Sequence, residues 1–227
     1  MPKITVKIGK AKFDMEVIDS AGESVAAEIF KYREYRRAEQ VIVDSKLPII
    51  DVGAHVGLFS AYCRALNSAV KIVAIEPERK NFSTLNDNVQ ANKLVNILTI
   101  NAALSGENGR RELMISADSH NHALFGSSQE SRVVSARTLT SIMDELQIKK
   151  AGLVKMDIEG GEGEVLRSLS SEDFARVEYF ILEYHEKIVP KKELENIFRV
   201  HGYGVQIFPS KFDKTMGFIF AHNKRFN

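Results

Sequence analysis

The sequence predicts an α/β protein whose mostly parallel sheet carries helices on both faces. Two observations point to this class. From residue 48 onward, short apolar runs alternate with helix-length segments, which is the pattern of strand–helix–strand units. Several of these runs end in glycine or in acidic residues, as strands do where an open α/β sheet binds its ligands.

The composition is that of a globular domain without a strongly charged partner. The chain has 227 residues, 44% hydrophobic and 27% charged, which is enough for one domain with a sizeable core. Its 31 basic and 30 acidic residues leave a formal net charge of +1, which argues against a nucleic-acid partner. Cys63 is the single cysteine, no apolar run is long enough to cross a bilayer, and the first residues lack a secretory signal. We therefore expect a cytoplasmic protein with no membrane partner.

Residues 1–45 predict a small accessory segment ahead of a main domain at residues 46–227. Alternating apolar residues at 4–8 and 13–18 predict two short strands with a turn between them. Residues 25–43 are rich in helix formers and charges, and they predict one helix with a solvated face. This helix contains the basic run KYREYRR, which we interpret as part of the solvated face rather than as a nucleic-acid patch.

In the main domain, strands and helices are expected to alternate, with one interruption. The first part predicts strands at 49–52, 71–75 and 97–100 and helices at 56–66 and 79–92. In the middle, strands at 111–116 and 132–136 flank a long loop with His120 and His122, and a helix follows at 138–146. The alternation resumes with strands at 153–158 and 179–184, helices at 162–169 and 191–201, and a hairpin of strands 203–208 and 216–221. Long loops are often lids, but a solvated loop is the interpretation we favour.

A glycine loop follows the first strand of the main domain. Gly53 and Gly57 allow a sharp turn and a close approach of the backbone to a ligand, with Ala54 and His55 between them. The following helix N-terminus offers N–H groups suited to a carboxylate. Asp51, at the end of the strand, would meet a cationic amino group directly or through water. S-adenosylmethionine carries both groups on its methionine end, and we predict it as the cofactor.

A nicotinamide dinucleotide is the alternative cofactor for such a loop. Its G-x-G-x-x-G fingerprint, started at Gly53, needs glycine at positions 55 and 58. The chain has His55 and Leu58 at these positions. The loop therefore favours a nucleoside without a pyrophosphate, and an oxidoreductase is the least favoured function.

The ends of the next two strands supply the remaining cofactor candidates. Glu76 and Pro77 end the second strand, where an acid roughly twenty residues after the glycine loop can accept hydrogen bonds from both ribose hydroxyls. Asn101 and Ala102 follow the third strand, where a small residue leaves room for an adenine ring and an amide can reach its edge. Asn101 is equally compatible with a plain turn.

A cluster of acids follows the strand predicted at 153–158. Side chains alternate along a strand, so Lys155, Asp157 and Glu159 are expected on one face, at the edge where α/β sheets bind ligands. Glu162 is equally well explained as an acid that opposes a helix dipole. We interpret Asp157 and Glu159 as functional.

The chain resembles the FkbM family of O-methyltransferases. The resemblance rests on DVGAHVGLFS, AIEP, an asparagine-rich helix end, NAALS, KMDIEGGE and LEYH, and it covers about residues 48–185. The segment KMDIEGGE is the most diagnostic of these. One departure is His55, which stands where the family more often has asparagine.

The resemblance implies a Rossmann-like class I methyltransferase with a seven-stranded sheet. It also implies transfer of a methyl group from S-adenosylmethionine, commonly to a hydroxyl oxygen, here of a small-molecule or glycan acceptor. A hydroxyl acceptor benefits from a base, and the candidates are Asp157, Glu159 and His185. Their spacing does not demand a metal, and we predict none. An RNA methyltransferase and a non-catalytic protein that binds the same cofactor are the rival functions.

Overall fold

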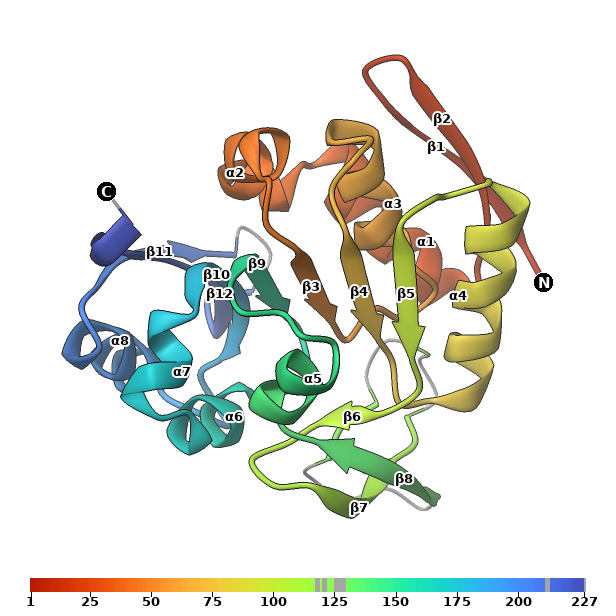
Figure 1. Ribbon diagram of the computed structural model, residues 1–227. Coiled ribbons are helices and arrows are strands. Elements are labelled where there is room, and N and C mark those ends of the chain that lie inside the picture. The colour runs from red at the N-terminus through yellow and green to blue at the C-terminus, as the bar shows by residue number, and fades with distance from the viewer. Residues whose placement is uncertain (117–118, 120–121, 125–129, 211–212, 227) are drawn as a thin grey trace.

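The computed structural model describes residues 1–116, 119, 122–124, 130–210 and 213–226. Its centre is a seven-stranded sheet with the strand order β11-β12-β10-β9-β3-β4-β5 (Figure 1). The strands are β3 (Ile49–Val52), β4 (Ile72–Ile75), β5 (Ile97–Ile100), β9 (Ala151–Met156), β10 (Val177–His185), β11 (Tyr203–Pro209) and β12 (Met216–Asn223).

The sheet is parallel except for one strand. The pairs β10–β9, β9–β3, β3–β4 and β4–β5 are parallel, whereas β12 runs antiparallel to both of its neighbours, β10 and β11. The closing hairpin expected from the sequence is thus confirmed, and it extends the sheet beyond β10. Parallel strands end at the same edge, and Figure 1 shows β3, β4 and β5 pointing to one side of the molecule.

Helices pack on both faces of this sheet. One face carries α5 (Leu139–Glu145), α6 (Glu162–Ser168), α7 (Ser171–Ala175) and α8 (Lys191–Val200), and the other carries α3 (Leu58–Leu66) and α4 (Arg79–Ala91). Neighbouring strand residues separate accordingly, because side chains alternate across a strand. Ile49 and Leu153 pack with α3, whereas Ile50 and Val154 pack with α5 to α8. The α/β class with helices on both faces is confirmed.

The N-terminal segment packs into the same core as the sheet. It contains β1 (Lys3–Ile8), β2 (Ala11–Glu16), α1 (Ser20–Ala26), the π-helical turn η1 (Ala27–Lys31), the 3₁₀ turn η2 (Glu34–Ala38) and α2 (Glu39–Asp44). Met15, Ile29 and Tyr35 share one buried cluster with Phe59 of α3. The division of the chain at residue 45 stays a prediction.

The single helix expected at residues 25–43 is wrong. Arg33 adopts a left-handed backbone conformation, φ 53°, and separates η1 from η2. In one straight helix, at about 100° per residue, Ile29 and Tyr35 would point about 120° apart. Both side chains are buried in the same cluster, so the chain breaks the helix to bring them there.

The middle of the chain forms a second, smaller sheet. It has the order β6-β8-β7 and consists of β6 (Ala103–Leu104), β7 (Gly109–Met114) and β8 (Ser131–Arg137). Figure 1 shows it beyond the ends of β3 to β5. The sequence did not predict β6 or α7. His120 lies outside the described residues, and His122 is described.

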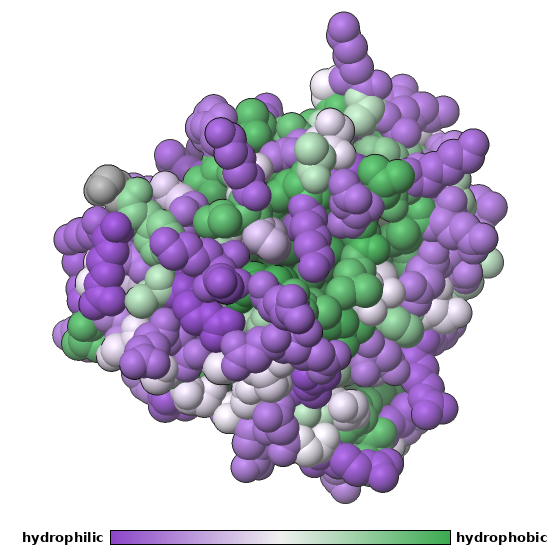
Figure 2. All heavy atoms as spheres, viewed as in Figure 1, coloured by the Kyte–Doolittle hydropathy of each residue, from purple (hydrophilic) through white to green (hydrophobic). Residues whose placement is uncertain are grey.

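The visible surface is mostly hydrophilic, with one hydrophobic area in its middle (Figure 2). This area lies where Figure 1 draws β4 and β5, and Leu98 of β5 is 39% exposed. A last 3₁₀ turn, η3 (Lys224–Phe226), ends the described chain. None of the helices in the described ranges is long and apolar enough to cross a membrane.

Candidate functional site

A cavity of about 280 Å³ lies at the carboxyl ends of the parallel strands. Residues that follow β3, β4, β5 and β9 line it, together with residues of the N-terminal segment and of the hairpin β11–β12. This is the edge at which open α/β sheets bind ligands.

The glycine loop is held tightly against the turn after β9. Gly53 has φ +71°, and a Cβ atom built on it would lie 1.9 Å from the Asp157 carbonyl oxygen. Gly57 has φ +90°, and its Cβ would lie 2.6 Å from Leu85 of α4. The two glycines are therefore required by packing within the protein as well as by the turn itself.

Glu76 joins the end of β4 to the glycine loop. Its Oε2 accepts a hydrogen bond from the His55 N–H at 2.8 Å, and its Oε1 accepts one from the Glu78 N–H at 3.0 Å. The residue is 5% exposed and lines the cavity. Burial raises the pKa of the Glu76 carboxyl to about 7, although these two backbone donors favour the charged form.

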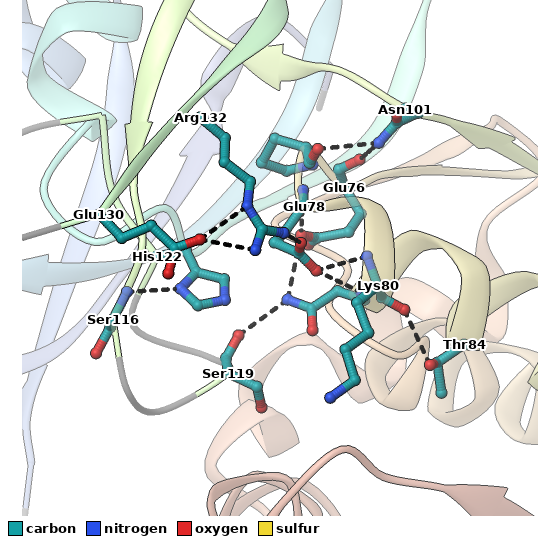
Figure 3. A network of polar contacts seen from close by, with 12 residues as sticks. Glu76, Glu78, Lys80, Thr84, Asn101, Ser116, Ser119, His122, Glu130 and Arg132 are labelled. Atoms are coloured by element: carbon teal, nitrogen blue, oxygen red, sulfur yellow. Dashed lines mark hydrogen bonds and ion pairs between the residues drawn. The ribbon is translucent and has the colours of Figure 1, made fainter. Parts of the chain in front are cut away.

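A polar network surrounds Glu76 (Figure 3). Ser119 contacts several members of this network. The Ser119 N–H and hydroxyl both donate to Asp19 at 2.9 Å, and the Ser119 hydroxyl lies 2.9 Å from His55 Nε2. The Asn81 amide donates to the Ser119 carbonyl oxygen at 2.9 Å. The network thus ties the N-terminal segment, the glycine loop and α4 together beside Glu76.

Glu78 anchors the same network from the start of α4. Its Oε2 caps the helix by accepting from the N–H groups of Lys80 and Asn81, at 2.6 and 2.8 Å. Its Oε1 accepts from Arg132 of β8 at 2.8 Å, as Figure 3 shows. The small sheet is thereby fixed to the helix that follows Glu76.

Lys155 and Asp51 lie beneath the glycine loop. They are neighbours in the register of β3 and β9, with 3.5 Å between Lys155 Nζ and Asp51 Oδ1. Lys155 Nζ also donates to the Gly53 carbonyl oxygen at 2.9 Å and lies 3.7 Å from Asp157 Oδ2. Burial alone would lower the pKa of Lys155, but the carboxylates of Asp51 and Asp157 outweigh it and the pKa is raised.

A group of acids also lines the cavity. Asp157, Glu159, Glu183 and Glu28 all line it, and Glu28 comes from the N-terminal segment. Burial, followed by the charges of Asp157 and Glu162, raises the pKa of Glu159 to about 8. Burial first, and then Glu34 and Asp157, raise the pKa of Glu28 to about 7. The pKa of Glu183 is also raised, by burial and by Asp157.

His185 stands behind Glu159 rather than in the cavity. Its Nε2 lies 3.3 Å from Glu159 Oε2, and His185 does not line the cavity. Burial lowers the pKa of His185, with the Asp157 charge opposing. The imidazole is therefore neutral near pH 7. Among the residues that the structure describes, no group of three His, Cys, Asp or Glu side chains could hold a metal ion.

The cavity brings most of the sequence candidates together. Its lining includes Gly53, Ala54, His55, Glu76, Pro77, Ala102, Asp157 and Glu159. The lining does not include Asp51, Gly57, Asn101 or His185. The roles assigned to all of these residues stay predictions.

Two candidates outside the cavity have their polar groups engaged elsewhere. Asp51 is 0% exposed, and its Oδ2 accepts from the Ser60 hydroxyl at 2.7 Å. The Asn101 amide donates to the carbonyl oxygens of Glu76 and Pro77, at 2.8 and 3.0 Å. Asn101 therefore acts here as the turn residue that the sequence also allowed. Glu162, which was left open, braces the turn before α6 by accepting from the Ile158 N–H at 3.0 Å.

The sequence interpretation missed several cavity residues. Glu28 carries no motif, and Tyr35 belongs to the run KYREYRR, which was interpreted as part of a solvated face although Tyr35 is buried; only the folded chain brings both to the sheet edge. Asn81 and Ser119 were missed because their contacts join distant parts of the chain. Glu183 lies in the segment LEYH that carries the family resemblance, but the sequence interpretation took only His185 from it.

The sequence comparisons give one family model and several methyltransferase relatives. The family described as "Methyltransferase FkbM domain" matches residues 51–226. "Methyltransferase 1" of Beauveria bassiana is 25% identical over 158 residues, and the match covers 60% of this chain and 63% of that protein, less than two thirds of its length. "31-O-demethyl-FK506 methyltransferase FkbM" of Streptomyces tacrolimicus is 24% identical and covers 82% of this chain and 84% of that protein. "Hexuronic acid methyltransferase AglP" of Haloferax volcanii is 24% identical, with 72% and 69% covered.

Solved structures share the fold. A methyltransferase FkbM from Methylobacillus flagellatus KT has a TM-score of 0.56 at 16% identity, over 91% of this chain and 56% of that chain. The N-terminal domain of human METTL16 in complex with SAH has a TM-score of 0.56 at 14% identity, over 93% and 75%. At these identities the likeness establishes the class I Rossmann-like methyltransferase fold.

Proposed function

The chain belongs to the FkbM family of methyltransferases, and we propose that it moves the methyl group of S-adenosylmethionine to a hydroxyl oxygen of a small molecule or glycan. The family supports methyl transfer. The hydroxyl acceptor is supported by the name of the Streptomyces relative, which describes a missing methyl on an oxygen, and the glycan option by the hexuronic acid relative. The observation that carries the proposal is one acid-lined cavity that joins the glycine loop to the acids after β9.

The residues around the cavity fit this cofactor by their charge. S-adenosylmethionine has a sulfonium and an ammonium group against one carboxylate, so it brings a net positive charge. Several acids line the cavity, and Lys155 is the lysine in the described lining. Burial holds the pKa values of Glu28 and Glu159 near 7 and 8, and a cation beside these acids would favour their charged forms.

We assign the nucleoside to the end of the cavity formed by the glycine loop and Glu76. Glu76 keeps its carboxylate fixed by the His55 and Glu78 N–H groups, and it would accept a hydrogen bond from the ribose. Ala102 offers a small apolar wall for the adenine. Asp51, which is buried below the loop, would act indirectly by holding Lys155 under the Gly53 carbonyl.

We assign the acceptor to the end with Asp157 and Glu159. The cofactor supplies a methyl group that its sulfonium already activates, so the chain mainly has to orient the acceptor oxygen and remove its proton. Glu159 is the favoured base, because its pKa of about 8 is close to the working range of such a group. Asp157, paired with Lys155 at 3.7 Å, would orient the hydroxyl, and His185, whose Nε2 lies 3.3 Å from Glu159 Oε2, stays the third candidate for the base.

Label transfer tests this function. The protein is incubated with methyl-labelled S-adenosylmethionine and fractionated cell extract, and the labelled product is analysed for a new methyl ether. We expect wild-type protein to label a hydroxyl of a small molecule or glycan. Glu159→Gln, which keeps the shape and removes the base, should lower the rate at least about a hundredfold.

Two results would contradict the proposal in different ways. Cofactor binding by calorimetry without labelling of any fraction would make the chain a non-catalytic binding protein. Label on nitrogen would keep the methyltransferase and refute the hydroxyl acceptor, and label in RNA would keep the methyltransferase and refute the small-molecule or glycan acceptor. Glu172→Gln is the matched control, because Glu172 is an exposed acid on α7 and not part of the cavity.

A further inference from the structure

Asn81 sits beside Glu76 with a fixed side-chain orientation. It is 2% exposed, lies in the first turn of α4 and lines the cavity. Its Nδ2 donates to the Ser119 carbonyl oxygen at 2.9 Å and lies 3.4 Å from Glu76 Oε1. Rotating the amide by 180° would turn its oxygen toward two other acceptors, so the network sets which atom is Oδ1.

The second polar atom of this amide is its oxygen, Oδ1. Asn81 Oδ1 is buried and has no hydrogen-bond partner among the described residues. Buried polar atoms in folded proteins are nearly always hydrogen-bonded, so an acceptor of this kind on a cavity wall indicates a donor on the ligand. The donor is expected close to the group that Glu76 binds, because the two side chains are in contact.

We infer that Asn81 is a cofactor-binding residue whose Oδ1 accepts a hydrogen bond from a ribose hydroxyl, next to the hydroxyl that Glu76 binds. This inference rests on the proposed cofactor. Two acceptors side by side match the two adjacent hydroxyl donors of a ribose. The amide adds to the carboxylate without placing a second negative charge at the wall.

A double-mutant cycle between protein and ligand tests the inference by titration calorimetry. The ligands are S-adenosylhomocysteine and its 2′-deoxy and 3′-deoxy analogues, and the proteins are wild type and Asn81→Ala. Wild type should lose about tenfold in affinity for one deoxy analogue, the value of one hydrogen bond. Asn81→Ala should lose about tenfold for the parent ligand but no more than about twofold for that analogue.

The outcomes separate this inference from the proposed function. If Asn81→Ala weakens the parent and both analogues by equal factors, its role is structural and the inference is refuted. If wild type does not bind S-adenosylhomocysteine, the cofactor assignment fails and the inference with it. Asn86→Ala is the matched control, since Asn86 is an asparagine of the same helix outside the cavity and should leave all affinities unchanged. Thermal unfolding checks each variant, and Asn81→Ser replaces the alanine variant if that one does not fold.

Discussion

The two ends of the cavity are built from the same kind of side chain and behave differently. At the nucleoside end, both oxygens of Glu76 accept hydrogen bonds from backbone N–H groups, and the neighbouring Glu78 caps α4. At the acceptor end, Glu159 and Glu183 face other acids, and burial with mutual repulsion raises the pKa of both. The Glu76 carboxyl is therefore fixed by backbone donors, although burial raises its pKa to about 7 as well, whereas the acids at the other end also raise the pKa values of one another by repulsion.

This difference suggests that the two ends of the cavity have different tasks. A carboxylate held by backbone donors cannot reorient, which suits recognition of a constant group such as a ribose. Carboxyl groups with raised pKa values exchange protons near neutral pH, which suits proton removal from an acceptor. Variants at the first end should change stability and cofactor affinity, and variants at the second should change the response to pH.

The largest effect is expected from Gly53→Ala, at the junction of the two ends. The new Cβ would lie 1.9 Å from the Asp157 carbonyl oxygen, so the loop and the turn after β9 must separate. We expect a loss of about 4 kcal/mol in the free energy of unfolding, measured with denaturant. Gly202→Ala is the control, because it has a similar φ of +87° but open space around it, and should cost about 1 kcal/mol. Equal losses in the two variants would show that backbone strain alone matters.

Glu76→Ala tests the fixed end alone. The change removes the acceptor for the ribose hydroxyl next to the one assigned to Asn81, and we expect cofactor affinity to fall at least about tenfold, or about 1.4 kcal/mol. Calorimetry with S-adenosylhomocysteine measures it, with Glu172→Ala as an exposed acid that should change nothing. Unchanged affinity in the Glu76 variant would remove the ribose assignment and with it the contrast between the two ends.

The sequence named residues of the cavity lining where they follow one another along the chain, and it missed lining residues that only the fold brings together. The glycine loop and Glu76 were found because a strand, a turn and an acid follow one another along the chain. Asp51 was expected to meet the cofactor directly or through water, and that role stays a prediction; the register of β3 and β9 places it beside Lys155, outside the lining of the cavity. Glu28 and Asn81 carry no local signal, because cavity position is set by packing between distant segments.

Glu159→Gln tests the titrating end through stability. In the folded protein the pKa of Glu159 is about 8, against an ordinary value of 4.5, so between these values the folded state holds a proton that the unfolded state has lost. The free energy of unfolding therefore falls as pH rises through this range and is level above it. We expect melting temperatures of the Glu159 variant to decline less between about pH 5 and about pH 8 than those of wild type. Parallel curves would mean that Glu159 carries no extra proton in the folded protein.

The smallest effect is expected from Asn101→Ala, and it separates the sequence interpretation from the structure. An amide on the adenine edge would cost the variant about tenfold in cofactor affinity. In the structure both contacts of that amide are to the carbonyl oxygens of Glu76 and Pro77, so the variant should lose about 1 kcal/mol of stability and less than about twofold in affinity. Calorimetry and denaturant unfolding of the same preparation measure both. A large loss of affinity with unchanged stability would place Asn101 in the cavity after all, and would extend the fixed end of the site from β4 to β5.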